Sequence, residues 1–182
     1  MGPHRRCLHG HRLDVAGMTR TYSHVLGLHA TCCLLCLELH TDRPAWYDLD
    51  HTVLRRADVP PGPHPRVVEL VAHPPDRPAG VGHIALQVHG RAVADVDLQL
   101  CGIDRRACVE QISVDEDYRR RRVGTVLVAA ALALGPGWQW STTKIDSAVG
   151  ARAFWASLDT ADVLHLGGRA YCSHMEGAHD VA

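Results

Sequence analysis

The hydrophobic pattern changes its period at one point of the chain, and this change limits the folds that the chain can adopt. Apolar and polar residues alternate in ADVDLQLCG (94–102) and ACVEQISV (107–114), which is typical of half-buried strands. VGTVLVAAALALG (123–135) then places apolar residues at helical spacing, and the Gly-Pro-Gly at 135–137 ends this helix. The chain therefore turns from a strand into a helix within residues 115–122.

The flanking segments extend this order on both sides. VVELVA (67–72) and VGHIALQVHG (81–90) precede it with two further strand patterns. WQWSTT (138–143) follows as a strand, SAVGARAFWASL (147–158) as a second helix, and HLGGRAYCSHM (165–175) as a last strand-like segment. This order predicts a single α/β domain with a mixed, mostly antiparallel sheet flanked by helices.

Composition excludes several classes of protein. The chain has 182 residues, 46% of them hydrophobic, which suits one domain with a real core. A net charge of -1 argues against a surface built to grip nucleic acid. The apolar stretch at 25–39 is too short to span a membrane and contains His29 and Glu38. We expect a cytoplasmic protein with no membrane contact.

The cysteines and the N-terminal segment carry weaker signals. Seven cysteines without regular spacing favour reduced thiols over a disulfide framework. Cys33, Cys36 and His40 have a spacing that suits one helical face and zinc, but no fourth ligand is specified and the surrounding leucines favour buried thiols. No metal is expected. Residues 1–20 have no usable periodicity and are predicted to form a poorly ordered tail.

The turn itself, DEDYRRRRVG (115–124), places four arginines at the start of a helix. A helix N-terminus has backbone N–H groups without acceptors and a partial positive charge, so it can bind an anion. Guanidinium groups add bidentate donors for phosphate, yet they destabilise the helix start when no anion is bound. Taken alone, the run is more typical of a solvated basic face.

The segment SVDEDYRRRRVGTVL resembles the acyl-CoA-binding motif of the GNAT superfamily, the acyl-CoA-dependent N-acetyltransferases. The positions in register with the motif are Val114, Tyr118, Arg119, Val123, Gly124 and Leu127. Ala151, Phe154 and Trp155 match the helix of the family's next segment. The resemblance covers about residues 66–175 and implies a GNAT-like domain over 21–182, with its motif core at 107–158 and central strands that splay apart.

The resemblance also implies acetyl-CoA as cosubstrate. Strand edges at 112–114 would bind the pantetheine arm, amides at 120–125 would bind the pyrophosphate, and the Val114 amide would polarise the acetyl carbonyl. The cofactor-binding residues it implies are Ile112, Ser113, Val114, Arg119, Arg120, Arg121, Arg122, Val123, Gly124, Thr125, Ala148 and Trp155.

Three positions depart from the family's pattern. Arg122 stands where the motif has its first Gly, and Ala148 stands where the family often has Asn. Trp155 stands where the family often has a Tyr that acts as general acid. Tyr171 is therefore the candidate general acid. Glu110, four residues before Val114, is the candidate base, with a solvent-facing strand residue as the alternative interpretation. His83, Asp95 and Asp97 are further candidates.

The predicted function is transfer of an acetyl group from acetyl-CoA to a primary amine by direct attack, since no acyl-carrying nucleophile is evident. The acceptor is a small molecule or a protein, and a homodimer is left open. A second hypothesis is a non-catalytic module that uses the same anion site for CoA or nucleic acid. A third is a metal-stabilised interaction protein that uses residues 24–40.

Overall fold

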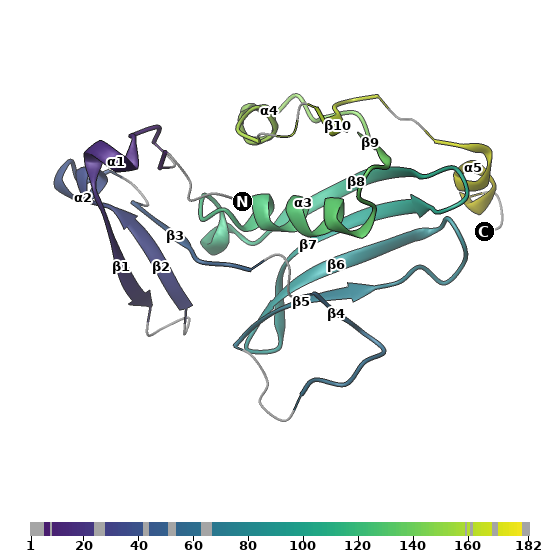
Figure 1. Ribbon diagram of the computed structural model, residues 1–182, viewed down its shortest axis with the longest axis horizontal. Helices are drawn as coiled ribbons and strands as arrows, with labels where there is room; N and C mark the ends of the chain where they lie inside the picture. Colours follow the sequence, from purple (N-terminus) through teal and green to yellow (C-terminus); the bar gives the residue numbers. More distant parts are fainter. Residues whose placement is uncertain are drawn as a thin grey trace.

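The computed structural model describes residues 6–7, 9–23, 28–41, 44–50, 54–62, 67–158, 160, 162–168 and 171–179. Two sheets organise these residues, and Figure 1 shows the smaller one at the end of the molecule where α3 begins. The large sheet has the order β10-β9-β8-β7-β6-β5-β4. Its strands are Leu54–Arg56 (β4), Val68–His73 (β5), Val81–Val88 (β6), Arg91–Cys101 (β7), Arg106–Val114 (β8), Gln139–Thr142 (β9) and Leu164–His165 (β10).

The large sheet is mixed and mostly antiparallel, as predicted. β5 to β8 form an antiparallel meander, whereas β4, β9 and β10 pair with their neighbours in parallel. The helices that flank it are Val123–Leu134 (α3), Val149–Ala156 (α4) and Ser173–His179 (α5). Parallel pairing of β8 and β9 requires a crossover, and α3 supplies it. The prediction of an α/β fold is therefore confirmed.

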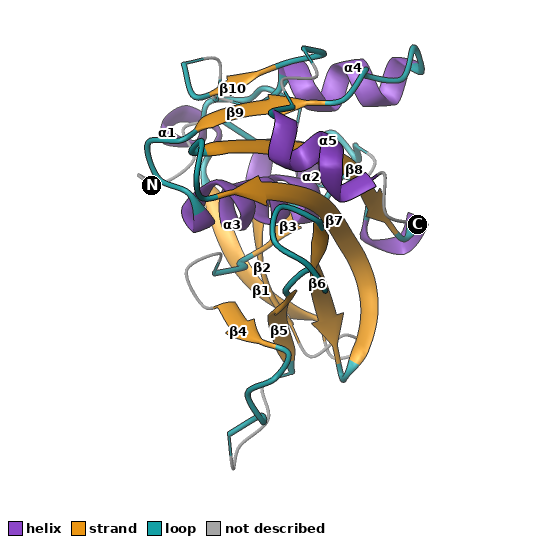
Figure 2. Ribbon diagram, turned by 90° about the vertical axis from the view of Figure 1, so that its right-hand side faces the viewer, coloured by secondary structure: helices purple, strands orange, loops and turns teal. Residues whose placement is uncertain are grey.

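Alternation along β7 sends its side chains to two differently covered faces. Val96 and Leu98 are buried in the main core, to which Leu127 of α3 also belongs. Gln99 and Cys101 point to the opposite face, where α5 packs. In Figure 2, α5 lies in front of β7 and α3 behind it.

Gln99 fixes α5 to the sheet. Its side chain is fully buried, and its amide donates hydrogen bonds to the carbonyls of Met175, at 2.9 Å, and Ala79. Its amide oxygen lies 3.2 Å from Nε2 of His179. One side chain thus holds the helix that follows Tyr171, and with it the position of that tyrosine.

The C-terminal prediction was wrong in part. The strand at Leu164–His165 is only two residues long, because Gly167 has a φ of +73° that ends the extended backbone. Residues 173–179 form a helix rather than a strand, with Met175 fully buried on its inner side. A short segment with few β-branched residues did not distinguish these two outcomes.

The small sheet lies before the meander in the chain. It contains Met18–Ser23 (β1), Leu28–Cys33 (β2) and Ala45–Tyr47 (β3), with short helices at Leu13–Ala16 (α1) and Leu34–Glu38 (α2). The apolar stretch at 25–39 thus contains a strand followed by a helix. The segment predicted as a tail, residues 1–20, contains α1, and β1 crosses the predicted boundary. None of the helices in the described residues is long and apolar enough to cross a membrane.

We expect Gln99→Met to lower the free energy of unfolding by about 1–3 kcal/mol, because the carbonyls of Met175 and Ala79 lose their donor. Gln111→Met, on the adjacent strand but exposed, is the matched control and should change it by less than about 0.5 kcal/mol. Urea denaturation of both variants tests this. Equal losses in the two would show that the buried amide does not stabilise the α5 face.

Candidate functional site

The large sheet opens between β8 and β9. Parallel pairing runs from Arg106 opposite Gln139 to Val109 opposite Thr142, and a last hydrogen bond joins Thr143 N to the Val109 carbonyl at 3.1 Å. β8 continues to Val114, so residues 110–114 have no strand beside them on this edge among the described residues. This is the divergence of central strands that the sequence resemblance implies.

A β-bulge at Glu110 decides which backbone groups face this opening. Asp97 pairs with Gln111 while Leu98 pairs with Val109, so Glu110 is the extra residue of β8. Before the bulge, the Val109 carbonyl faces β9. After it, Asp115 N bonds to the Val93 carbonyl on the β7 side. Because backbone groups two residues apart face the same side, those of Ser113 also face β7.

The bulge therefore directs the backbone groups of Ile112 and Val114 toward the opening. The Glu110 carbonyl supports this orientation, because it accepts a hydrogen bond from Thr143 Oγ1 on the β9 side at 2.8 Å. Of the three strand residues predicted to pair with a ligand, Ile112 and Val114 are placed to do so. Ser113 instead pairs with Asp95 of β7.

The two predicted catalytic residues meet at the closed end of this opening. The hydroxyl of Tyr171 donates a short hydrogen bond to Oε1 of Glu110. Tyr171 is also stacked on the ring of His179, with 5.4 Å between ring centroids, so α5 fixes its position from the other side. Both side chains are partly buried.

Further polar side chains lie on the same face of the meander. His83 pairs across the strands with Asp97, and its ring stacks on His73 with centroids 4.2 Å apart. Burial, and then the neighbouring Asp97 carboxylate, raises the pKa of Asp95. Burial, and then His83, lowers the pKa of His73. The face beside Glu110 thus carries two neighbouring aspartates and a stacked pair of histidines.

The arginine run forms the turn into α3, and its last residue caps this helix without offering a side-chain acceptor to the first N–H groups. Arg122 is the N-cap residue, in a left-handed conformation with φ 63° and ψ 12°, and it makes no side-chain capping bond. The first turn of α3 has no acidic residue. The N–H groups of Val123, Gly124 and Thr125 have no acceptor within the helix, so this end of α3 suits an anion.

Side chains of the run donate hydrogen bonds to backbone carbonyls of the protein itself. Arg119 Nε donates to the Val114 carbonyl at 2.9 Å, and Arg121 Nε donates to the Asp117 carbonyl at 3.1 Å. Arg122 Nη2 donates to the Arg6 carbonyl at 2.8 Å, and burial lowers the pKa of its guanidinium. The run is therefore neither a uniform solvated face nor a free basic patch.

Arg121 and Arg122 also join the turn to the small sheet. The guanidinium of Arg121 lies 5.2 Å from the ring centre of Tyr47, and that of Arg122 lies 5.1 Å from the ring centre of Trp46. Tyr47 N bonds to the Arg121 carbonyl at 3.3 Å. The sequence pattern did not predict that β3 supports the turn, because this contact joins distant segments.

α4 packs on the first turn of α3. A Cβ on Gly124 would lie 2.9 Å from Cε2 of Phe154, so glycine makes room for this ring. Trp155 lies edge-on to Phe154 and is partly buried, and Ala148 caps α4 with its N–H bonded to Asp146. Gly124, which is predicted to bind the cofactor, thus also makes room for a ring of the neighbouring helix.

The fold and the opening define a mixed α/β protein whose sheet diverges beside the N-terminus of a helix. The model of the Acetyltransferase (GNAT) family matches residues 37–159, and the chain belongs to this family. The resemblance stated from the motif is thereby confirmed.

Comparison with solved structures finds YhhK from E. coli, a candidate N-acetyltransferase whose solution structure contains coenzyme A. The match has 27% identity and a TM-score of 0.34, and it covers 42% of this chain. It spans 57% of that protein, little more than half its length. No curated protein matches this chain.

Arg122 has a left-handed backbone that favours glycine, so the two small substitutions should differ. We expect Arg122→Ala to be about 1 kcal/mol less stable than Arg122→Gly, because only glycine adopts this φ without cost. At exposed Arg152 in α4 the order should reverse, with Gly less stable than Ala by about 0.5–1 kcal/mol. Urea denaturation of the four variants measures both differences, and the same order at both sites would contradict the assignment.

Proposed function

We propose that this protein transfers the acetyl group of acetyl-CoA to a primary amine by direct attack. The observation that carries the proposal is the hydrogen bond between Tyr171 and Glu110 at the closed end of the β8–β9 opening. It joins a proton acceptor and a proton donor where the acyl group of a ligand bound along β8 would lie. Family membership supports acetyl transfer as the general chemistry.

The groups proposed to bind acetyl-CoA lie along one path. Ile112 and Val114 offer backbone groups to the pantetheine arm, and the start of α3 offers N–H groups to the pyrophosphate. The amides proposed for the pyrophosphate are those of Arg120, Arg121, Arg122, Val123, Gly124 and Thr125. Exposed Arg120 adds positive charge there, while Arg119 holds the Val114 carbonyl. Ala148 and Trp155 border this path from α4.

The proposed reaction begins with the acceptor as an ammonium ion, since a free amine of this type has a pKa of about 10.4. Glu110 accepts the proton, directly or through water, and the neutral nitrogen attacks the thioester carbon. A strand N–H that faces the opening donates to the oxygen as it becomes negative, and that of Ile112 lies nearer to Glu110 along β8 than that of Val114. Collapse of the tetrahedral intermediate breaks the C–S bond and releases CoA thiolate, and the nitrogen loses its second proton to solvent.

Tyr171 closes the proton balance in this proposal. Its hydroxyl can give a proton to the leaving thiolate and recover one from Glu110, to which it is already hydrogen-bonded. Trp155 cannot do this, because its ring N–H is not an acid at neutral pH. The acidic face formed by Asp95 and Asp97 supports a cationic acceptor, which we take to be an amine of a small molecule or a protein.

We expect Glu110→Gln to lower kcat by roughly 10²–10⁴-fold and to leave the affinity for acetyl-CoA within about twofold. Tyr171→Phe should also lower kcat, by a smaller factor, since solvent can protonate a thiolate. Calorimetric titration with acetyl-CoA and release of free thiol with a panel of amines measure the two quantities. Glu176→Gln, an exposed carboxylate on α5, is the matched control and should change neither.

The outcomes separate the hypotheses. Unchanged turnover in Glu110→Gln would remove Glu110 as the base but retain the transferase. Binding of acetyl-CoA without turnover on any amine would favour the non-catalytic module. Absence of acetyl-CoA binding at concentrations well above those typical of cosubstrates would refute the ligand assignment itself.

A further inference from the structure

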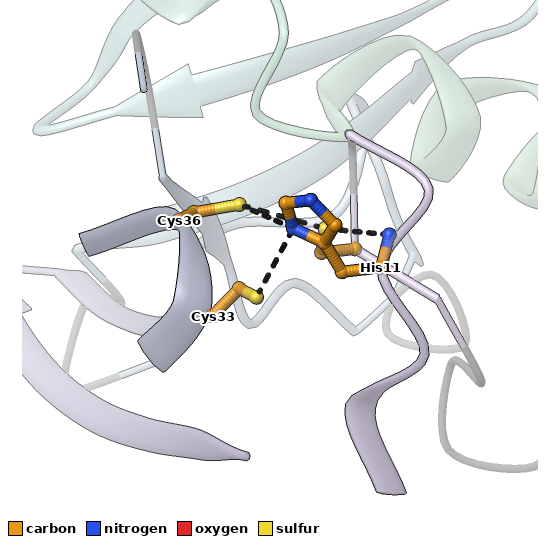
Figure 3. A group of neighbouring side chains, drawn as sticks. His11, Cys33 and Cys36 are labelled. Atoms are coloured by element: carbon orange, nitrogen blue, oxygen red, sulfur yellow. Dashed lines mark hydrogen bonds between the residues drawn. The ribbon is translucent and has the colours of Figure 1, made fainter. Parts of the chain in front are cut away.

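We propose that Cys7, His11, Cys33 and Cys36 form a structural zinc site in the small sheet. Their ligand atoms all lie within 4.8 Å of one another, and Figure 3 shows His11, Cys33 and Cys36 converging on one point. Three thiolates and one imidazole are a ligand set that Zn²⁺ takes in closed tetrahedral sites. All four residues precede residue 37, where the family match begins.

The spacing of the ligand atoms suits a tetrahedral ion. Cys7 Sγ and Cys36 Sγ are 3.6 Å apart, and His11 Nδ1 lies 3.2 Å from Cys36 Sγ and 3.8 Å from Cys33 Sγ. Zn–S and Zn–N bond lengths with tetrahedral angles give ligand separations of about 3.5–3.8 Å. A disulfide between Cys7 and Cys36 is excluded, since it requires sulfurs about 2.05 Å apart.

The backbone holds each ligand in place. Arg6 and Arg12 form a bridge that closes a loop around Cys7 and His11, and Cys7 N bonds to the His11 carbonyl at 2.9 Å. The amides of His9 and His11 both donate to Cys7 Sγ at 3.3 Å, an arrangement that stabilises a thiolate.

The other two thiols come from the end of β2 and the first turn of α2. Cys33 precedes α2 and Cys36 lies within it, and both are fully inaccessible to solvent. This is the Cys-x-x-Cys spacing noted in the sequence, but its partners are Cys7 and His11. His40 lies beyond the helix and is exposed.

The small sheet contributes Ala30 and Tyr47 to the main core and has only a small buried cluster of its own. This cluster consists of Cys7, Leu13, Cys33, Cys36 and Trp46. Three of these five are proposed ligands, so the metal would occupy the centre of the core. Metal binding is a common source of stability for units with so small a core, because its free energy adds directly to folding.

A positive charge lies where this site needs one. Zn²⁺ with three thiolates and a neutral imidazole has one net negative charge, which is costly to bury alone. Arg122 interacts electrostatically with Cys7, and its guanidinium is bonded to the Arg6 carbonyl next to this cysteine. It is partly buried over Trp46 of the same cluster.

A second group of donors differs in its chemistry. Cys101, Asp104, Cys172 and His174 also lie close together. There the Asp104 carboxylate accepts hydrogen bonds from Cys172 and Cys101 and lies 2.8 Å from the His174 ring. Those donors satisfy one another around an existing anion, whereas the first site gathers three thiols and an imidazole.

Zinc content of the full chain tests the first site. The wild type, purified in the presence of zinc and then passed through gel filtration, should retain the metal bound by Cys33 and His11. Elemental analysis should therefore show that Cys33→Ser and His11→Ala each lose about one equivalent of zinc per chain. Cys32→Ala is the matched control: it removes a buried thiol adjacent to Cys33 that is not part of the cluster, and it should retain the full content. Zinc content that is unchanged in Cys33→Ser and His11→Ala would overturn the proposal.

A second measurement uses the wild type alone, in case the variants fold poorly. Cobalt added to the metal-free chain should give the d–d bands of tetrahedral Co²⁺ and a thiolate charge-transfer band, and zinc should displace both. Chelation should raise amide hydrogen exchange in β1–β3 by roughly tenfold or more and leave β5–β8 unchanged. An octahedral cobalt spectrum, or exchange in β1–β3 that does not respond to chelation, would refute the site. Neither measurement depends on acetyl transfer.

Discussion

The extra residue in β8, Glu110, is the constraint on which the rest of the site depends. In a regular strand the backbone groups of successive residues face the two neighbouring strands in strict alternation. The hydrogen-bonding groups of Ile112 and Val114 would then face β7. The bulge reverses this alternation where pairing with β9 ends. It also brings the Glu110 carboxylate to Tyr171. One inserted residue therefore determines both the open strand edge and the position of the candidate base.

In the turn after β8, Arg122 both adopts a left-handed backbone and makes side-chain contacts with the small sheet. These two roles usually fall on different residues. A glycine at position 122 would adopt the left-handed backbone without cost, whereas arginine adopts it at a cost of about 1–2 kcal/mol. Arg122 offsets this by its hydrogen bond to the Arg6 carbonyl and its contact with Trp46. The departure from the family's motif is thus explained by a contact that exists only because the small sheet is present.

Local patterns predicted the parts of this molecule that depend on local physics. The alternation in β7 and β8 and the helical spacing in α3 appear as expected, because each reflects burial of one face. The bulge was not predicted, since it depends on register between two strands. The packing of Gly124 against Phe154 was not predicted for a similar reason, because Phe154 comes from another helix. Cys33 and Cys36 were recognised as a metal-like pair and then set aside, because no fourth ligand was specified and the leucines around them favoured buried thiols. Cys7 and His11, which the structure brings to this pair, lie in a segment without periodicity.

A contiguous set of contacts joins the proposed zinc site to the turn at the start of α3. Cys33 ends β2, β2 pairs with β3, and β3 places Trp46 and Tyr47 against Arg122 and Arg121. The backbone bond from Tyr47 to Arg121 fixes the turn at the point where its amides face the proposed pyrophosphate position. Loss of the metal would therefore act on the acetyl-CoA site through the turn and not through Glu110. This predicts weaker acetyl-CoA binding with an unchanged kcat at saturation, the reverse of what substitution of the base produces.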